Sequence, residues 1–385
     1  MSKSKVVVTG ATGFLGWALA QSLVEDPSTA SIICTGRNKA KGDAALSSLL
    51  SSLPPSHPTT ISFVYADLAD ADDMVESSLW DVLGEADVVY HAAALSSPWG
   101  KRADFVAANV DATANVLAAM ESGASSSSRT CPARMVYIST PSIYASSSPL
   151  LGIREDPERE RDMSSDRTFV NAYAETKAAG EGLVYAAVDR GLVEAVVLRP
   201  RALFGPGDTT LLPRIVRAAQ TNRLRVIGSD RVLQDLTYID NAVHAARLAA
   251  CADAATVNGK AYNITNDEPV RVWDMLTLLM QGLHLPTPKT PAIPVFLAAW
   301  IASLIERIFS LLAWGEPPLT VYGVYAVGLS MTFDITNARN DLGYRPLVSI
   351  STGIQNTIEA HALPSRHATP WHATPFTPPF TRSRL

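Results

Sequence analysis

A short glycine-rich stretch near the start of the chain, VVVTGATGFLG at 6–16, constrains the fold more than any other feature. Its three β-branched valines predict a buried strand, and Gly10, Gly13 and Gly16 then recur at every third position. Gly10 allows a tight turn, Gly13 allows a phosphate to approach the backbone, and Gly16 allows the next helix to pack closely. The N–H groups that begin this helix, expected over about 14–23, favour a pyrophosphate. The pattern predicts a dinucleotide-binding turn; an ordinary glycine-rich turn is the alternative.

Composition narrows the class of protein. A chain of 385 residues with 47% hydrophobic and 18% charged residues can bury a large core. A net charge of −5 without a long basic run argues against a nucleic-acid partner. The three cysteines, Cys34, Cys131 and Cys251, lie far apart, which is typical of a reducing compartment and predicts no zinc or other metal site. No apolar signal region precedes the first predicted strand, so we expect no secretion.

Apolar strands alternate with helical segments along the first half of the chain. Further strands are expected at 31–35, 61–66, 86–90, 135–138 and 195–198. This order predicts an α/β fold: a doubly wound, mostly parallel sheet of seven strands, with a smaller mixed substrate lobe. We expect the dinucleotide-binding domain at 1–200, 236–260 and about 336–361, the lobe at 201–235 and 261–335, and a disordered tail at 362–385.

Residues that follow the predicted strands bear on the choice of cofactor. Arg37 follows the second strand, where a carboxylate would bind the adenosine ribose and favour NAD. A guanidinium suits a 2′-phosphate, so we expect NADP, with NAD left open and a solvated loop arginine as the alternative. Asp67 and Leu68 end the third strand, and the carboxylate can bind the adenine amino group or cap the next turn. His91 is expected to be a packed, hydrogen-bonded residue and not a catalyst.

Tyr173 and Lys177 stand four residues apart, which places them on one face of a predicted helix. A phenol with a pKa of about 10 is a poor base at neutral pH. A neighbouring ammonium favours the phenolate and lowers that pKa, and a hydroxyl from Ser139 or Thr140 would hold the substrate oxygen. The set predicts proton transfer coupled to hydride transfer with a cofactor.

These motifs resemble the extended short-chain dehydrogenase/reductase family. The matching segments are TGATGFLG at 9–16, DL at 67–68, HAAA at 91–94, NVDAT at 109–113, ISTPSIY at 138–144, YAETK at 173–177 and LRP at 198–200. Later segments resemble its 3β-hydroxysteroid dehydrogenase branch, which includes sterol-4α-carboxylate 3-dehydrogenases and bacterial 2-alkyl-3-oxoalkanoate reductases. They are RPRALFGPGDTTLLPRIV at 199–216, QDLTYIDNAVHA at 234–245, AYNITNDEPV at 261–270, EPPLT at 316–320 and FDITNARNDLGYRP at 333–346.

The resemblance implies a role for each matching residue. Tyr173 would be the acid/base, and Lys177 would lower its pKa and bind the nicotinamide ribose. Thr140 would bind the substrate, with Ser139 as its neighbour and stand-in, and Asn109 resembles the helix asparagine associated with the site. The expected cofactor-binding residues are Gly10, Thr12, Gly13, Phe14, Leu15, Gly16, Arg37, Asp67, Leu68, Ala92, Ala93, Tyr173, Lys177 and Pro200.

The implied function is the NADP-dependent interconversion of a secondary alcohol and a ketone. The substrate would be apolar, of sterol, terpenoid or β-keto-acyl type, in lipid, sterol or secondary metabolism. Arg37 departs from the acidic strand end of NAD-dependent steroid members, which leaves the cofactor and the direction open. One alternative is a sugar-nucleotide epimerase or dehydratase, which the apolar second lobe disfavours. The other is a non-catalytic cofactor-sensing regulator, which the intact Thr140, Tyr173 and Lys177 disfavour.

Residues 293–314 form the most apolar stretch, interrupted by Glu306 and Arg307. A membrane-spanning helix needs about 20 uninterrupted apolar residues, so we expect a helix that lies on a membrane surface or covers the substrate. An ordinary core helix is the alternative. Trp300 and Trp314 suit the headgroup boundary, while Glu306 and Arg307 are expected to face water together. The expected location is cytoplasmic, on the cytosolic face of an internal membrane if this helix binds lipid, and a homodimer is left open.

Overall fold

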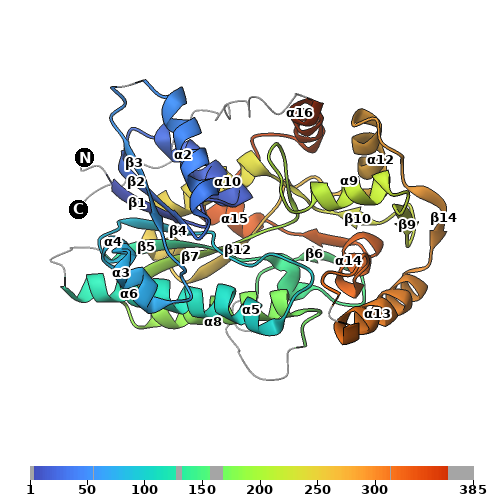
Figure 1. Ribbon diagram of the computed structural model, residues 1–385, viewed down its shortest axis with the longest axis horizontal. Helices are drawn as coiled ribbons and strands as arrows, with labels where there is room; N and C mark the ends of the chain where they lie inside the picture. The colour runs from blue at the N-terminus through green and yellow to red at the C-terminus, as the bar shows by residue number, and fades with distance from the viewer. Residues whose placement is uncertain (1–3, 55, 127–131, 157–167, 313, 363–385) are drawn as a thin grey trace.

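A seven-stranded parallel sheet forms the centre of the protein (Figure 1). The computed structural model describes residues 4–54, 56–126, 132–156, 168–312 and 314–362. The sheet order is β12-β7-β5-β4-β1-β2-β3, and every pairing in it is parallel. Its strands are β1 Ser4–Thr9, β2 Thr29–Gly36, β3 Thr60–Tyr65, β4 Val88–His91, β5 Ala133–Ile138, β7 Val193–Pro200 and β12 Lys260–Ile264. The predicted doubly wound fold is confirmed.

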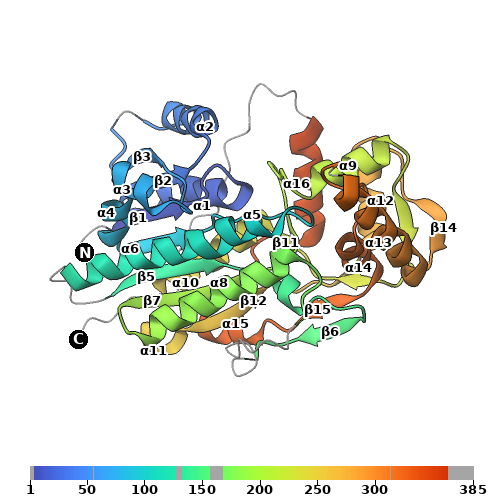
Figure 2. The ribbon, with the colours of Figure 1, turned by 60° about the horizontal axis from the view of Figure 1, so that its bottom comes forward.

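Helices cover both faces of this sheet. One face packs against α1 Phe14–Val24, α2 Lys39–Ser52, α10 Ile239–Cys251 and α15 Thr336–Asp341. The other packs against α3 Ala71–Glu76, α4 Leu79–Gly84, α6 Ala112–Ser126 and α8 Ala172–Asp189, and Figure 2 shows α6 and α8 lying along it. Val6 and Val8 of β1 point into the first cluster and Val7 into the second. A strand buried on both faces explains the uninterrupted valines.

The turn after β1 requires small residues because other backbone segments approach it closely. Gly10 has a φ of +67°, in the left-handed region, and a Cβ there would lie 2.7 Å from the Ala93 backbone. A Cβ at Gly16 would lie 2.3 Å from the Gly10 carbonyl oxygen. The glycine spacing therefore lets β1, α1 and the segment after β4 meet at one point.

A smaller lobe continues from the carboxyl edge of the large sheet. Its four-stranded mixed sheet has the order β13-β10-β15-β6, and β6 pairs in parallel with β15 although the two are far apart in sequence. These strands are β6 Leu150–Ile153, β10 Leu233–Gln234, β13 Val270–Arg271 and β15 Met331–Phe333. Around them lie α9 Leu212–Gln220, α12 Val272–Gly282, α13 Val295–Leu312, α14 Val321–Gly328 and α16 Ile350–Ala362.

Short elements complete the described chain. Two-stranded sheets pair β8 Leu203–Phe204 with β11 Thr237–Tyr238, and β9 Arg225–Ile227 with β14 Lys289–Ile293. Single turns are α5 Arg102–Val106, the π-helical η1 Ala107–Asp111, the 3₁₀-helical η2 Pro141–Tyr144 and α11 Ala254–Val257. Strand β12 pairs with β7, so the predicted lobe segment 261–335 begins inside the large sheet. The division into domains stays a prediction, and its tail lies outside the described residues from 363 onward.

Helix α13 lies at the end of the molecule opposite β2 and β3 (Figures 1 and 2). Only Ala298 and Ala302 of its 18 residues are buried, so the alternative of a core helix is wrong. The Glu306 carboxylate accepts the Val321 N–H at 2.8 Å and therefore faces α14, whereas Arg307 is exposed. The expectation that these two charges face water together is wrong because successive helical residues lie about 100° apart around the axis.

Replacing Gly10 by alanine should lower the free energy of unfolding more than the same change at Gly191. Both glycines have left-handed φ, +67° and +76°, but nothing lies within 4 Å of a Cβ at Gly191. A left-handed alanine costs about 1–2 kcal/mol, which both variants share. Overpacking against Ala93 should add about 1–3 kcal/mol at Gly10 alone. Urea unfolding measures both losses, and equal losses would contradict the close backbone approach.

Candidate active site

The candidate site lies at the carboxyl ends of the sheet strands, where three segments meet at the phenol of Tyr173. Tyr173 is on the first turn of α8, and the hydroxyls of Thr140 and Ser96 lie close enough to its phenol to favour the ionised form. Thr140 follows β5 and Ser96 follows β4. Doubly wound sheets bind their ligands at this edge. Sequence reasoning missed Ser96, although a hydroxyl that follows β4 must emerge at the same edge as Thr140.

The charge on Lys177 is directed at the end of β5. Its Nζ donates to the Ile138 carbonyl oxygen at 2.6 Å and lies 4.0 Å from the centre of the Tyr137 ring. Burial lowers the pKa of Lys177 to about 7, against the attraction of the Glu181 carboxylate. The predicted lowering of the Tyr173 pKa differs from the structure, because burial raises that pKa while the Thr140 and Ser96 hydrogen bonds oppose the rise.

Asn109 joins the segment after β4 to the helix of Tyr173. It is fully buried in the π-helical turn η1. Its Oδ1 accepts the Leu95 N–H at 2.7 Å, and its Nδ2 donates to the Thr176 hydroxyl at 3.0 Å. Thr176 precedes Lys177 on α8. Asn109 therefore acts on the site through the placement of two backbones, and single π turns are frequent at functional sites.

A buried ion pair lies beside these groups. The Glu181 carboxylate pairs with the Arg199 guanidinium, and their side chains are 3% and 0% exposed. Burial opposes the charge on Arg199, but the attraction of Glu181 raises its pKa well above the usual value. The Ser139 hydroxyl donates to Glu181, and the Arg199 guanidinium donates to the Tyr144 hydroxyl. Ser139 is thus held by the ion pair, while Thr140 reaches the phenol.

The glycine-rich turn fits the pyrophosphate of a dinucleotide. Gly13 caps α1 without a side chain to accept the first N–H groups, and the first turn contains no acidic residue. A phosphate would supply acceptors for these N–H groups. The Ala93 N–H donates to the Thr9 hydroxyl at 3.2 Å, which holds the segment after β4 against this turn. The turn contains the predicted residues Gly10, Thr12, Gly13, Phe14, Leu15 and Gly16; Ala92 and Ala93 follow β4, and Pro200 ends β7.

Arg37 and Asp67 lie at the ends of β2 and β3, where the adenosine would bind. The Arg37 Nη1 lies 3.5 Å from the Asp67 Oδ2, and the two side chains are 66% and 43% exposed. Asp67 also accepts the Ala69 N–H at 3.1 Å, which is the predicted turn role, while Leu68 is buried in the core. An exposed ion pair contributes only about 0–1 kcal/mol to stability, so a ligand can replace either partner at little cost.

His91 at the end of β4 is structural, as predicted. Its side chain is completely buried and is hydrogen-bonded to the hydroxyls of Thr9 at 2.8 Å and Thr113 at 3.0 Å. Burial, together with the nearby charge of Lys177, lowers the pKa of His91 to about 3. The imidazole is therefore neutral at physiological pH and ties β1 and β4 to η1 and α6.

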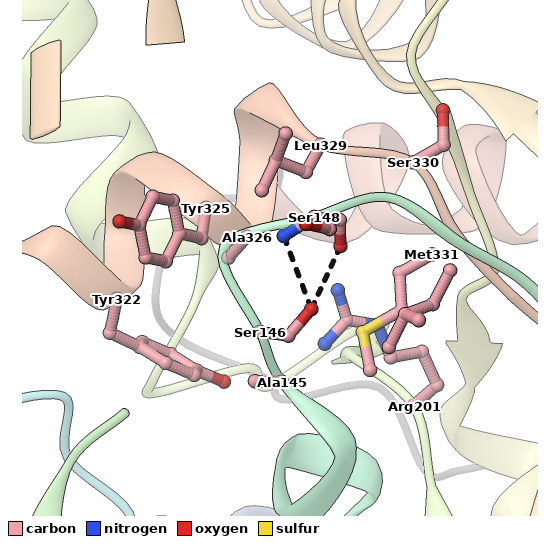
Figure 3. A pocket seen from close by; sticks show the side chains of 11 residues that line it. Ala145, Ser146, Ser148, Arg201, Tyr322, Tyr325, Ala326, Leu329, Ser330 and Met331 are labelled. Atoms are coloured by element: carbon pink, nitrogen blue, oxygen red, sulfur yellow. Dashed lines mark hydrogen bonds between the residues drawn. The ribbon is translucent and has the colours of Figure 1, made fainter. Parts of the chain in front are cut away.

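A hollow opens between the segment 145–150, α14 and the start of β15 (Figure 3). Its volume is about 330 Å³, part of which is open to solvent. The Tyr322 hydroxyl on its wall lies 2.7 Å from the Ser142 Oγ, which lies 3.0 Å from the Thr140 Oγ1. A series of hydroxyls therefore connects the hollow to Tyr173. Sequence reasoning missed Tyr322, because its helix is distant in sequence from every motif of the site.

Similarity to known proteins agrees with this geometry. Residues 6–265 match the NAD dependent epimerase/dehydratase family. The chain belongs to this family. It is 34% identical over 355 residues to 2-alkyl-3-oxoalkanoate reductase of Stenotrophomonas maltophilia, with 91% of this chain and 97% of that protein covered. It is 32% identical over 311 residues to 3beta-hydroxysteroid-dehydrogenase/decarboxylase isoform 2 of Arabidopsis thaliana, with 78% of this chain and 52% of that protein covered.

Solved structures of the family share the fold. The UDP-glucuronic acid 4-epimerase of Bacillus cereus, in complex with UDP-glucuronic acid and NAD, superposes with a TM-score of 0.66 at 21% identity, covering 92% of this chain and 98% of that one. At this level of sequence identity, the similarity between the two structures shows a shared fold and nothing more. Together with the dehydrogenase and reductase relatives, the family makes this chain an NAD-dependent epimerase/dehydratase-family oxidoreductase. The predicted resemblance to the 3β-hydroxysteroid dehydrogenase and 2-alkyl-3-oxoalkanoate reductase branch is confirmed.

Proposed function

We propose that the protein interconverts a secondary alcohol and a ketone on an apolar 3-oxo or 3-hydroxy substrate of β-keto-acyl, sterol or terpenoid type. The observation that carries this proposal is the phenol of Tyr173, which the hydroxyls of Thr140 and Ser96 contact at the cofactor edge of the sheet. The names of the relatives support it, because one reduces 2-alkyl-3-oxoalkanoates and another is a 3β-hydroxysteroid dehydrogenase/decarboxylase. The sugar-nucleotide alternative is supported by the name of the family and by the fold shared with an epimerase at 21% identity.

Tyr173 would transfer the proton, and Thr140 would position the substrate. Held in the glycine-rich turn, a nicotinamide cofactor supplies the hydride for reduction or accepts it in oxidation. In reduction, Tyr173 gives its hydroxyl proton to the carbonyl oxygen of the substrate, and Thr140 holds that oxygen. In oxidation, Tyr173 takes the proton back. The phenol is protonated at neutral pH, because burial raises its pKa above the usual value, so Tyr173 holds the proton that reduction of a ketone needs.

Arg37 supports NADP as the cofactor. The guanidinium lies at the end of β2, 66% exposed, with Asp67 as its partner. A 2′-phosphate carries a larger negative charge than a carboxylate, and a guanidinium can bind two of its oxygens at once. If the phosphate replaced Asp67 as the partner of Arg37, the Asp67 carboxylate would be free to bind the adenine amino group. NAD would leave the present pair unchanged.

We also propose that the protein binds a membrane surface through α13. Its apolar face, Phe296, Trp300, Leu304, Ile308 and Leu311, is 77%, 65%, 47%, 40% and 85% exposed. Among the described residues, α13 is the one helix long and apolar enough to cross a membrane. The opposite face packs on the lobe through Ala298 and Ala302, and such a one-sided attachment suits a helix that lies flat in the interface. An apolar substrate could then enter the hollow from lipid.

Tyr173→Phe should lower kcat by about 10²–10⁴-fold and leave cofactor affinity near that of the wild type, because the ring stays and only the transferable proton is lost. The assay follows cofactor absorbance during oxidation of a 2-alkyl-3-hydroxyalkanoate. Tyr262→Phe is the matched control, since its hydroxyl bonds to Asp341 at the edge of the large sheet. A Tyr173→Phe variant that keeps more than about a tenth of the wild-type kcat would sink the assigned role.

Arg37→Ala should remove a preference for NADP. A charge-assisted contact contributes about 1.5–3 kcal/mol, so the wild-type ratio of kcat/KM for NADP over NAD should be about ten to a hundred. The variant should bring this ratio close to one by losing activity with NADP alone. Arg231→Ala, a change at an exposed arginine of the lobe, controls for net charge. Equal ratios in the wild type and in Arg37→Ala would show that the 2′-phosphate is bound elsewhere or not at all.

The triple variant Trp300→Ser, Ile301→Ser, Leu304→Ser should lose binding to liposomes, because it removes apolar area from the face assigned to lipid. Flotation of full-length protein with phospholipid vesicles measures this. The control changes three other exposed apolar residues, Leu50, Val75 and Leu151, to serine. Wild-type protein that stays in the soluble fraction would overturn the proposal, and equal flotation of both variants would assign the contact to another surface.

A further inference from the structure

A buried cation lies in the wall of the hollow. Arg201 follows β7, its side chain is 6% exposed, and its Nε has no hydrogen-bond partner among the described residues. The guanidinium donates to the side-chain amide oxygen of Gln234 at 2.6 Å, and the Tyr322 hydroxyl lies beside it; both groups are neutral. A buried charge that hydrogen-bonds only to neutral groups is costly, and a bound anion would offset that cost.

The acidic group that attracts this cation does not hydrogen-bond to it. Asp235 attracts Arg201, but its Oδ2 accepts the backbone N–H of Phe333 at 2.8 Å, and no hydrogen bond joins it to the guanidinium. Burial raises the pKa of Asp235 to about 6, against the Phe333 hydrogen bond and the attraction of Arg201. Its Oδ2 is bound to the backbone of β15, and its Oδ1 has no hydrogen-bond partner among the described residues. The free Nε and the forked geometry of Arg201 are left for a ligand.

The position of Arg201 relates this cation to the reacting group. Figure 3 shows its guanidinium inside the hollow, with Tyr322 on the α14 side. The Tyr322 hydroxyl lies 2.7 Å from the Ser142 Oγ, which lies 3.0 Å from the Thr140 Oγ1. Thr140 in turn lies beside the phenol of Tyr173. In a 3-hydroxy acid, the carboxylate is attached to the carbon next to the carbinol carbon. Such a molecule carries its anion close to its reacting oxygen, so a cation and a proton-transfer group in one site could bind both.

We infer that Arg201 and Tyr322 bind the carboxylate of a 3-oxo or 3-hydroxy acid while Tyr173 acts on its neighbouring oxygen. This inference rests on the proposed function and assigns the group that recognises the acid. An ester or a simple secondary alcohol would leave the guanidinium without an anion, so the enzyme would discriminate against both. Site selectivity of this kind is strong because a buried polar group left unpaired costs more than a lost apolar contact.

The test compares an acid with its methyl ester. Full-length enzyme, saturated with NADP, is assayed with 2-hexyl-3-hydroxydecanoate and with the methyl ester of that acid. The wild type should prefer the acid in kcat/KM by about ten- to a hundredfold. Arg201→Gln should lose this preference through a higher KM for the acid, with the ester within about threefold of the wild type. Arg214→Gln, at an exposed arginine paired with Glu316, is the matched control.

A binding measurement separates this inference from the proposed function. Calorimetric titration with 2-hexyldecanoate, which has the carboxylate but no hydroxyl to oxidise, should give at least tenfold weaker binding to Arg201→Gln than to the wild type. Tyr322→Phe gives a second result if Arg201→Gln does not fold, and should weaken binding severalfold. Equal losses for acid and ester, or unchanged binding of 2-hexyldecanoate, would make Arg201 a structural residue and overturn the inference. No turnover of either alcohol would instead refute the proposed function.

Discussion

The buried ion pair between Glu181 and Arg199 fixes the parts of the protein that the chemistry needs. Glu181 belongs to α8, the first two turns of which carry Tyr173 and Lys177, whereas Arg199 belongs to β7. Removing one partner of such a pair leaves an uncompensated charge and costs about 3–5 kcal/mol, so neither element can shift alone. Ser139 binds the same carboxylate, and the next residue presents its hydroxyl to the phenol. The ion pair thus sets the positions of the helix, the strand and the hydroxyl that we propose binds the substrate.

Much of the fold could be predicted because its strongest constraints are local. Three valines in succession required burial on both faces, and the left-handed φ of Gly10 required a residue without a side chain. The four-residue spacing placed Tyr173 and Lys177 on one helical face. The orientation of their side chains was beyond the sequence, because the Lys177 ammonium is bonded to the carbonyl of Ile138, a tertiary contact that no local pattern encodes.

The remainder of the site depends on contacts between residues far apart in the chain. Tyr322 and Arg201 meet only because α14 packs against the segment that leaves β7. The sequence could not separate Ser139 from Thr140 either, since both end the same strand and only the position of Glu181 decides which hydroxyl stays available. A shared fold is therefore a poor guide to substrate here. The large sheet supplies the cofactor edge, and the lobe supplies the side chains that would distinguish an acid from a sugar nucleotide.

The pairing of β6 with β15 has a consequence for how the chain acquires its shape during synthesis. The N–H groups of Leu150 and Gly152 bond to Ser330 and Thr332 at 2.9 Å, so the segment that walls the hollow is held by strands near the end of the chain. A ribosome completes every strand of the large sheet before those partners emerge. Non-local pairing is slow because the intervening loop must close first. The nascent protein can therefore assemble its dinucleotide edge early, while the hollow remains open until residues 330–332 have been made.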